Sequence, residues 1–452
     1  MPIVLPPNPL MQQPRWRCYY YGRPTDKWNA DLPTGISGVV ESDDGLNWTR
    51  VRGPLEEGAV LRPSDDSAAF DYVHVGFTDI IPQTDGSSVA LYLGGSADEL
   101  SLGMGPGSIK GFRMRPGIAL SKDGIAWERL LTANPMLDVG DAGSWDSVFC
   151  SWPRALPVDA AKPNGEWIMT YHSLMPPDKD GIPRWAVGVA VSTSGSIGPY
   201  TKLEGPVLSG GTPGSFDEAG IGTRHVVHKP NGSGIVMVYE GVSVADGRHR
   251  LGLATSIDNG RTWNKVMGVG VDPGGPIFEG APPDDNAWDN GNVGTPWVMQ
   301  LPDGRWRLYY VGTSRNRAVA IGAAESNELF SSQWTRVEVS GSGMCIDERN
   351  AVGETSLILA AERGDAKDVR MLLDLGADPR ATSGTGWTAL HGAAECGSVS
   401  AIQMLLEAGA DVLAVTRASK TSLDIAQKYN KQDAVKELLK LGAVSSQNVV
   451  KS

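Results

Sequence analysis

A long repeat in the N-terminal part constrains the fold of this chain more than any other feature. Four stretches open with an aromatic residue and an aspartate, and these aspartates are almost evenly spaced along the chain: Asp71, Asp146, Asp217 and Asp289. Each stretch leads into a run of aromatic and β-branched residues and then into an alternating run, which is typical of successive β-strands. Arg15–Gly22 (RWRCYYYG) matches Arg305–Gly312 (RWRLYYVG), which adds a fifth copy.

Three or four strands per copy, repeated five times, predict an all-β five-bladed propeller over residues 1–345. Radial repetition of this kind covers sheet edges that would otherwise be exposed. The first blade is expected to lack a complete N-terminal strand, because few residues precede Arg15. Turns such as Ser256–Trp263 (SIDNGRTW) separate the last two strands of a copy, and their aspartate is expected to accept backbone N–H groups.

A second, shorter repeat places Thr355, Thr388 and Thr421 at the start of three helical stretches. Thr388–Ala393 (TALHGA) resembles the signature of ankyrin repeats. The sequence therefore predicts an all-α solenoid of three ankyrin repeats over residues 350–444 and a disordered tail over 445–452. The resemblance implies a protein partner for this region and a structural role for His391. Glycines are expected to end the second helices, at Gly376, Gly409 and Gly442.

The charge of the chain disfavours two classes of ligand. Residues 353–452 hold 11 Lys and Arg against 12 Asp and Glu, so the earlier residues carry −11 of the net −12. An acidic surface repels phosphate backbones and anionic lipid, so neither nucleic acid nor membrane is expected as a partner.

The cysteines and the N-terminus indicate a reducing compartment. The four cysteines show no C-x-x-C spacing: Cys18, Cys150, Cys345 and Cys396. The segment Met1–Gly22 lacks the basic start and apolar run of a signal peptide. We expect a soluble, intracellular, cytoplasmic protein, and organellar targeting stays open if residues precede Met1.

Unlike residues stand at matching places on the predicted first strands. The eighth residues after the repeated aspartates are Asp79, Arg154, His225 and Trp297, and the seventh are Thr78, Pro153, Arg224 and Pro296. Positions that only build a blade tend to match, whereas a ligand site needs a different group from each blade. The aspartates recur in every visible copy, which favours a turn or strand-end role for them.

The N-terminal part resembles the five-bladed glycoside hydrolases of the arabinanase, levansucrase and invertase group, mostly in architecture. The resemblance implies cleavage or transfer of a furanoside or related glycoside by carboxylates facing the channel, one protonating the leaving oxygen and another attacking or activating water. On this sequence the catalytic candidates are Asp79, Glu218 and, less strongly, Asp146.

The same resemblance assigns substrate-binding side chains. Arg154, Arg224 and His225 are candidates to hold sugar hydroxyls, and Trp152 and Trp297 are candidates to stack on sugar rings. No cofactor and no metal ligand is expected, apart from a structural calcium on the propeller axis that the resemblance implies.

One departure from the group supports an alternative. The group takes an aspartate from its first blade, but residues 2–14 contain no acid. The alternative is a non-catalytic propeller that, with the ankyrin repeats, serves as a scaffold for protein or sugar binding. Activity against glycosides separates the two hypotheses.

Overall fold

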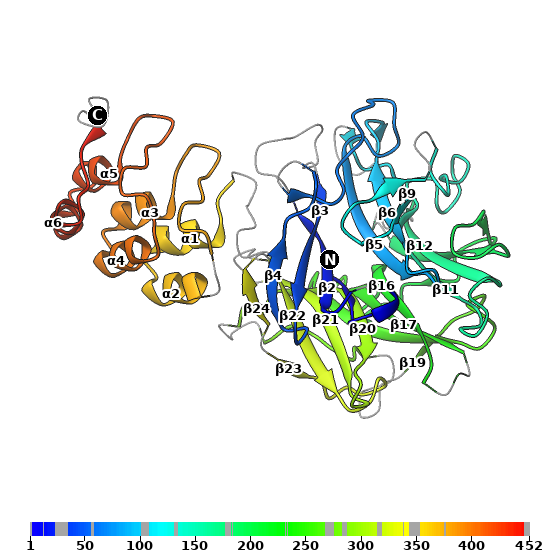
Figure 1. The fold of residues 1–452 in the computed structure, drawn as a ribbon. Helices are drawn as coiled ribbons and strands as arrows, with labels where there is room; N and C mark the ends of the chain where they lie inside the picture. The colour runs from blue at the N-terminus through cyan, green and yellow to red at the C-terminus, as the bar shows by residue number, and fades with distance from the viewer. Residues whose placement is uncertain are drawn as a thin grey trace. The chain divides into compact units, whose positions relative to one another are not determined.

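The structure is a computed structural model of the whole chain (Figure 1). The residues it describes are 2–11, 13–22, 35–55, 58–100, 108–130, 134–176, 182, 184–230, 232, 234–266, 275–282, 287–313, 319–337, 339–342, 353–374 and 377–446. Cys345 and Gly376 lie outside them. The chain divides into two compact units, one formed mainly by residues 1–339 and the other mainly by residues 340–452.

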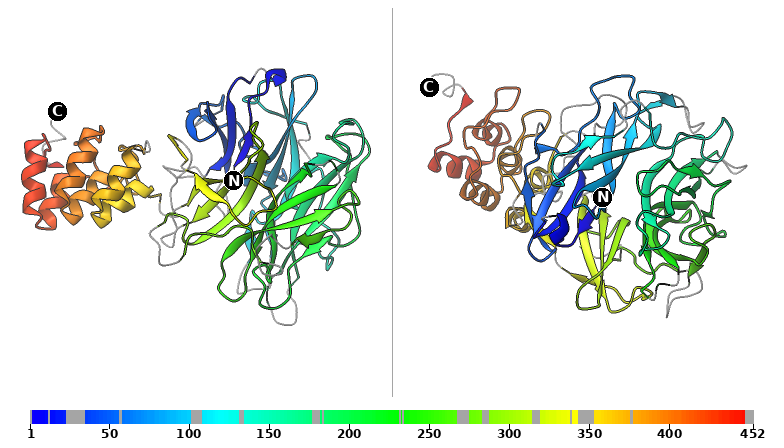
Figure 2. Two further views of the ribbon diagram at one scale, coloured as in Figure 1. Left: turned by 90° about the horizontal axis from the view of Figure 1, so that it is seen from below. Right: turned by 45° about the vertical axis from the view of Figure 1, so that its right-hand side comes forward.

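The first unit is mostly β, and antiparallel pairing groups most of its described strands into five modules in chain order (Figures 1 and 2). Modules 3 and 4 belong to one nine-stranded sheet, because Trp185 and Gly220 form a parallel bridge between them. Module 1 contains β1 (Ile3–Leu5), β2 (Trp16–Gly22), β3 (Ile36–Ser42) and β4 (Asn47–Val51). Module 2 contains β5 (His74–Pro82), β6 (Ser88–Gly95), β9 (Met114–Ser121) and β10 (Glu128–Arg129). Module 3 contains β11 (Ser151–Pro157), β12 (Trp167–Met175), β13 (Arg184–Ser192) and β14 (Thr201–Lys202).

Module 4 contains β16 (Gly220–His228), β17 (Ile235–Val242), β18 (His249–Ser256) and β19 (Asn264–Val266), and module 5 contains β20 (Asn292–Gln300), β21 (Trp306–Thr313), β22 (Val319–Ser326) and β23 (Thr335–Val337). The remaining short elements are η1 (Pro9–Met11), β7 (Glu99–Leu100), β8 (Ile109–Lys110), β15 (Leu208–Ser209) and β24 (Ser340–Ser342). One copy of the long repeat therefore corresponds to one four-stranded module.

Apolar side chains pack between consecutive modules. Leu91 of module 2 shares a buried cluster with Met169 of module 3, and Ile168 of module 3 shares another with Met237 of module 4. A third cluster joins modules 4 and 5. The hydrophobic effect thus holds each of these modules to the next along the chain.

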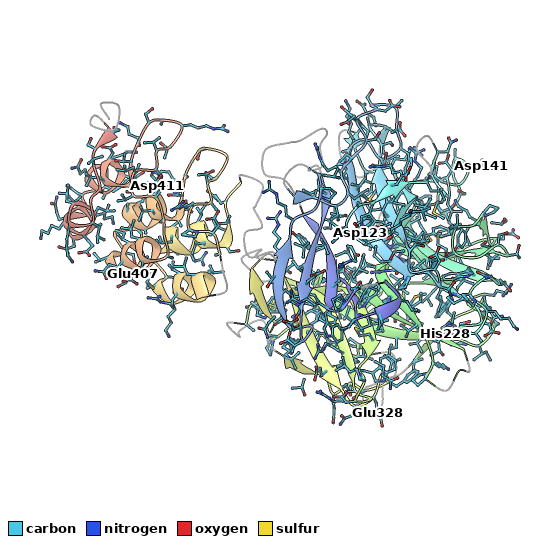
Figure 3. All side chains as sticks on the ribbon, viewed as in Figure 1. Asp123, Asp141, His228, Glu328, Glu407 and Asp411 are labelled. Atoms are coloured by element: carbon cyan, nitrogen blue, oxygen red, sulfur yellow. The ribbon has the colours of Figure 1, made fainter. Side chains whose placement is uncertain are left out.

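Modules 5, 1 and 2 are joined by a repeated pair of polar contacts. Arg307 and Tyr309 of β21 donate hydrogen bonds to the carbonyls of Asp44 and Gly45, at 3.0 and 2.7 Å. Arg17 and Tyr19 of β2 make the same contacts with Asp123 and Gly124, at 2.7 and 2.9 Å. Asp123, labelled in Figure 3, lies in the turn between β9 and β10. The last module therefore contacts the first in the way that the first contacts the second.

The turns between third and fourth strands are built as the sequence predicts. In the turn after β18, Asp258 Oδ1 accepts a hydrogen bond from the backbone N–H of Thr262, and Ser256 Oγ accepts one from Gly260. Trp263 is buried beneath the turn and donates to the carbonyl of Gly260. These contacts satisfy backbone groups that the turn leaves unpaired.

The second unit contains three helix pairs: α1 (Ser356–Arg363) and α2 (Ala366–Asp374), α3 (Ala389–Cys396) and α4 (Val399–Glu407), and α5 (Ser422–Lys428) and α6 (Gln432–Lys440). Each first helix is capped by the predicted threonine, whose side chain accepts a backbone N–H three residues on. Gly409 and Gly442 follow the second helices with positive φ, as predicted. Within the described ranges, no helix has the length and apolar character needed to cross a membrane.

Candidate functional site

The inner positions, which we define as Asp79, Arg154, His225 and Trp297, lie at equivalent places on the first strands of modules 2 to 5. The pairing of first and second strand shifts register directly before Asp79, Arg154 and Trp297. In module 4 the shift ends at Arg224, one residue before His225. Such a bulge bends the strand and redirects the side chains next to it. The four inner positions are all buried.

Three inner positions connect their strand to the first strand of the next module. Asp79 Oδ2 accepts a hydrogen bond from the backbone N–H of Ala155 at 2.9 Å. Arg154 Nε donates to the carbonyl of Arg224 at 3.1 Å. His225 Nδ1 accepts from the backbone N–H of Val298 at 3.1 Å. The unlike side chains at this repeat position therefore link successive first strands.

Asp79 and Arg154 are buried side chains of opposite charge, separated by a long ion-pair distance. Asp79 is 6% exposed and Arg154 1%, and Asp79 Oδ1 lies 3.9 Å from Arg154 Nη1. Burial raises the pKa of Asp79 to about 6, although Arg154 and the N–H of Ala155 oppose it. Burial lowers the pKa of Arg154 to about 10, again against the pull of Asp79. The Arg154 guanidinium also lies over the ring of Trp297, 4.7 Å from its centroid.

Arg224 is held by neutral groups. Its Nε donates to Thr170 Oγ1 at 3.0 Å and its Nη2 to the carbonyl of Trp152 at 2.8 Å. Its Nη1 lies 3.0 Å from His172 Nδ1 and 3.2 Å from the carbonyl of Gly222. The ring of Trp152 stacks on His172, with centroids 5.3 Å apart, so this face of Trp152 is used within the protein.

The stacking candidates Trp152 and Trp297 differ in accessibility. Trp297 is buried between the guanidinium of Arg154 and the ring of His225, whose centroid is 4.0 Å away. Trp152 is half-buried and has a positive φ of 50°, which is uncommon for a bulky side chain. Thr295 occupies the equivalent repeat position and also has a positive φ, of 45°. Such strained positions recur at the same point of the bulge in modules 3 and 5.

Glu240 and His249 form a second polar group that the sequence reasoning missed. Glu240 Oε1 lies 2.5 Å from His249 Nδ1, and Glu240 Oε2 accepts hydrogen bonds from Thr223 Oγ1 and from the N–H of Thr295. Burial would raise the pKa of Glu240, but these hydrogen bonds hold it below its usual value, and Glu240 in turn raises the pKa of His249 against the effect of burial. A Cβ on Gly294 would lie 2.6 Å from the Glu240 carboxyl group, so this glycine makes room for it.

A sequence signal existed for Glu240. It directly follows the tyrosine of the second strand, and the equivalent residues in the five copies differ: Tyr21, Leu93, His172, Glu240 and Val311. His172 and Glu240 both reach the bulge of the next module, at Gly222 and at Thr295. Comparing the residues at this matching place on the second strands would have selected both His172 and Glu240.

Asp146 makes the contacts of its repeat equivalents. Its carboxylate accepts hydrogen bonds from Tyr171 at 3.1 Å and from Lys202 at 2.7 Å. Each of the other repeated aspartates likewise meets a tyrosine of the second strand and a cation of the fourth: Asp71 with Tyr92 and Arg129, Asp217 with Tyr239 and Lys265, Asp289 with Tyr310 and Arg336. These contacts agree with the strand-end role that recurrence indicates.

The contacts of Glu218 differ from those of the inner positions. It is half-buried in the segment before β16, where its Oε2 accepts a hydrogen bond from the backbone N–H of Gly214 at 2.9 Å. Among the described residues, no hydrogen bond or ion pair joins Glu218 to Asp79 or to Asp146. The three carboxylates proposed from the resemblance are therefore not assembled into one hydrogen-bonded group.

An apolar residue takes the inner position of module 1. Ile3 pairs with Tyr19, as Trp297 pairs with Tyr309 at the corresponding place in module 5. Ile3 is fully buried. The position of module 1 that is equivalent to Asp79, Arg154, His225 and Trp297 therefore carries an aliphatic side chain.

The resemblance implies a structural calcium on the propeller axis, and clusters of metal-binding side chains bear on it. Among the residues that the structure describes, no three His, Cys, Asp or Glu side chains come together as they do around a metal ion. We therefore derive no chemistry from a metal.

Comparisons with known proteins agree with this division of the chain. Residues 336–416 and 357–448 match the family model for ankyrin repeats in three copies, so the C-terminal region consists of ankyrin repeats. A crystal structure of a glycosyl hydrolase from Bacteroides ovatus matches with a TM-score of 0.51 and 16% sequence identity, covering 74% of this chain and 85% of that chain. At this identity the likeness concerns the fold alone. Comparison with curated protein sequences gave no match.

Proposed function

We propose that the five modules form a closed five-bladed propeller with the first strands around its axis. The contacts of Arg307 and Tyr309 with Asp44 and Gly45 support closure, because they repeat those of Arg17 and Tyr19 between modules 1 and 2. Apolar clusters join module 2 to module 3, module 3 to module 4 and module 4 to module 5, and these clusters supply the remaining contacts of the ring.

We propose further that this propeller does not hydrolyse glycosides and that the chain is a scaffold that binds a protein partner through its ankyrin repeats. The observation that carries the proposal is the use of the inner positions. Asp79, Arg154 and His225 are buried and bonded to the next first strand, and Ile3 completes the set with an aliphatic group. Glycoside cleavage needs two carboxyl groups that reach one bond, and these positions supply one carboxyl group.

The segment between α4 and α5 supports partner binding by the ankyrin region. Leu413 and Val415 are exposed there, at 43% and 45%, as are Tyr429, Leu439 and Leu441 elsewhere in this unit. Exposed apolar side chains that lie close together can mark a protein interface. The full chain and its Leu413→Glu/Val415→Glu double variant each serve as bait to capture protein partners. Each captured protein is then purified, and its affinity for the two baits is measured by titration. Equal affinity of every partner for the two baits would contradict this assignment.

A second candidate function rests on Asp79. Its pKa of about 6 is suited to a general acid near neutral pH, which favours a glycoside-processing enzyme acting on a furanoside or related glycoside. In that case Asp79, Glu218 and Asp146 would share the acid, base and pKa-tuning roles. Arg154, Arg224, His225, Trp152 and Trp297 would hold the sugar. Assays of the full chain, Asp79→Asn and Glu218→Gln on a panel of chromogenic glycosides decide between the candidates.

A further inference from the structure

Two arginine side chains are buried on neighbouring first strands, in modules 3 and 4, and the charge of Arg154 adds to burial in lowering the pKa of Arg224. Arg154 and Arg224 are each 1% exposed, and Arg154 Nε donates to the backbone carbonyl of Arg224. Both side chains come from first strands, β11 and β16. Buried charges of one sign repel each other and are costly unless opposite charges compensate them.

The groups around this pair supply too little negative charge. Asp79, at 3.9 Å from Arg154, is the only carboxylate among the described residues within 4.0 Å of either guanidinium. The side-chain and backbone groups that Arg224 contacts, which belong to Thr170, His172, Gly222 and Trp152, carry no negative charge.

The two nearby imidazoles do not change this balance. Burial, and then the neighbouring guanidinium, holds the pKa of His172 and of His225 well below the usual value, so both rings are neutral at neutral pH. An arginine stays protonated in proteins, so two positive charges face one negative charge. The interior at this point has a net charge of about +1, counted from these side chains.

One of the guanidinium nitrogens also lacks a hydrogen-bond partner. Arg154 Nη1 is fully buried and makes no hydrogen bond to any described residue, although its separation from Asp79 is within ion-pair range. A water molecule could accept this hydrogen bond, but it would not neutralise the charge. An anion does both.

We propose that Arg154 and Arg224 form a binding site for one small monovalent anion, with Arg154 Nη1 as its hydrogen-bond donor. The excess of one positive charge sets the charge of the ligand, and the burial of both guanidiniums sets its small size. A halide and a small carboxylate such as formate share this chemistry. The site involves no residue of the ankyrin repeats, and its two arginines are those that the enzyme candidate assigns to sugar binding.

The test measures the thermal unfolding midpoint of the β unit in the full chain. Sodium chloride and sodium formate are titrated separately against sodium sulfate at constant ionic strength. We expect a saturable rise with at least one of the two anions, and the comparison of the two titrations identifies which source fits the site. If neither anion raises the midpoint above the sulfate value, the site holds water and the proposal is wrong.

Variants test whether the rise in the unfolding midpoint depends on this site. Arg154→Met should abolish the saturable rise, whereas Arg17→Met, which removes a mostly buried arginine already paired with Glu41, should retain it. Asp79→Asn removes the one compensating carboxylate and keeps an oxygen for the N–H of Ala155, so it should tighten anion binding about tenfold. If Arg154→Met fails to fold, Asp79→Asn decides the question. The proposal is contradicted if the anion concentration that gives half of the saturable rise is the same in Asp79→Asn as in the unchanged protein.

Discussion

The Tyr309 hydroxyl donates a 2.7 Å hydrogen bond to the carbonyl of Gly45, which joins residues 264 positions apart in the chain. Gly45 lies in a turn of module 1 and has a φ of 74°, so the turn favours glycine there. Tyr19 makes the equivalent bond to Gly124, also at positive φ. One local motif, an arginine and a tyrosine two residues apart on a second strand, thus binds the next module at two interfaces, one of which joins the two ends of the β unit.

Loss of the Tyr309 hydroxyl should weaken this long-range interface. Tyr309→Phe leaves the buried carbonyl of Gly45 without this donor, so the free energy of unfolding should fall by about 1–2 kcal/mol. Tyr72→Phe is the matched control, because its hydroxyl makes no hydrogen bond to a described residue. Chemical denaturation followed by tryptophan fluorescence measures both. Equal stability of Tyr309→Phe and the unchanged protein would remove this contact from the account.

The repeated aspartates should matter for stability equally in different modules. Asp146→Asn and Asp217→Asn each break a partly buried ion pair with a lysine, so each should lower the unfolding free energy by about 2 kcal/mol. Glu218→Gln is the control carboxylate, and it should change stability by less than about 1 kcal/mol because its contact is exposed. A stable Asp146→Asn protein that had lost a glycosidase activity would contradict the strand-end role.

Asp79 should make stability fall as the pH rises. Its folded pKa of about 6 exceeds its ordinary value of 3.8, so the folded state holds more protons than the unfolded state between these values. Stability therefore decreases from about pH 4 to pH 6, by about 3 kcal/mol for the full shift. Asp79→Asn removes this dependence, so the variant should become more stable relative to the unchanged protein as the pH rises from 4 to 7. Parallel pH profiles for the two proteins would show that the Asp79 pKa is ordinary.

His391 should stabilise the ankyrin unit rather than act in chemistry. Its Nδ1 bonds to Thr388 at 2.8 Å and its Nε2 lies 3.1 Å from the carbonyl of Lys420, which links two repeats. His391→Ala should cost about 1–2 kcal/mol, seen as a lower midpoint of the helical circular dichroism signal. Gln403→Ala, on an exposed helix face, is the control and should change the midpoint little. No difference between the two variants would contradict the capping role.

Repetition made much of this fold predictable. Both periods could be counted directly, and each corresponds to one structural unit, the four-stranded module or the helix pair. The turn aspartate Asp258 and the cap Thr388 were predictable for the same reason, because their contacts lie within a few residues of chain.

The candidate site was less predictable because it depends on contacts between modules. That Asp79 binds the N–H of Ala155, or that Arg154 lies on Trp297, follows from the packing of first strands and from bulges that no local pattern specifies. Glu240 was not predicted because it lies on a second strand and reaches the bulge at Thr295 from there. Variation within a repeat selects these inner positions but does not distinguish a ligand site from links between strands.

The scaffold function is tested most directly by measuring sugar release from a panel of furanosides and pyranosides by the purified full chain and by its Asp79→Asn variant. The scaffold function predicts that neither protein releases sugar above the enzyme-free blank. Release by the full chain that is lost in Asp79→Asn would contradict it and establish Asp79 as a catalytic residue.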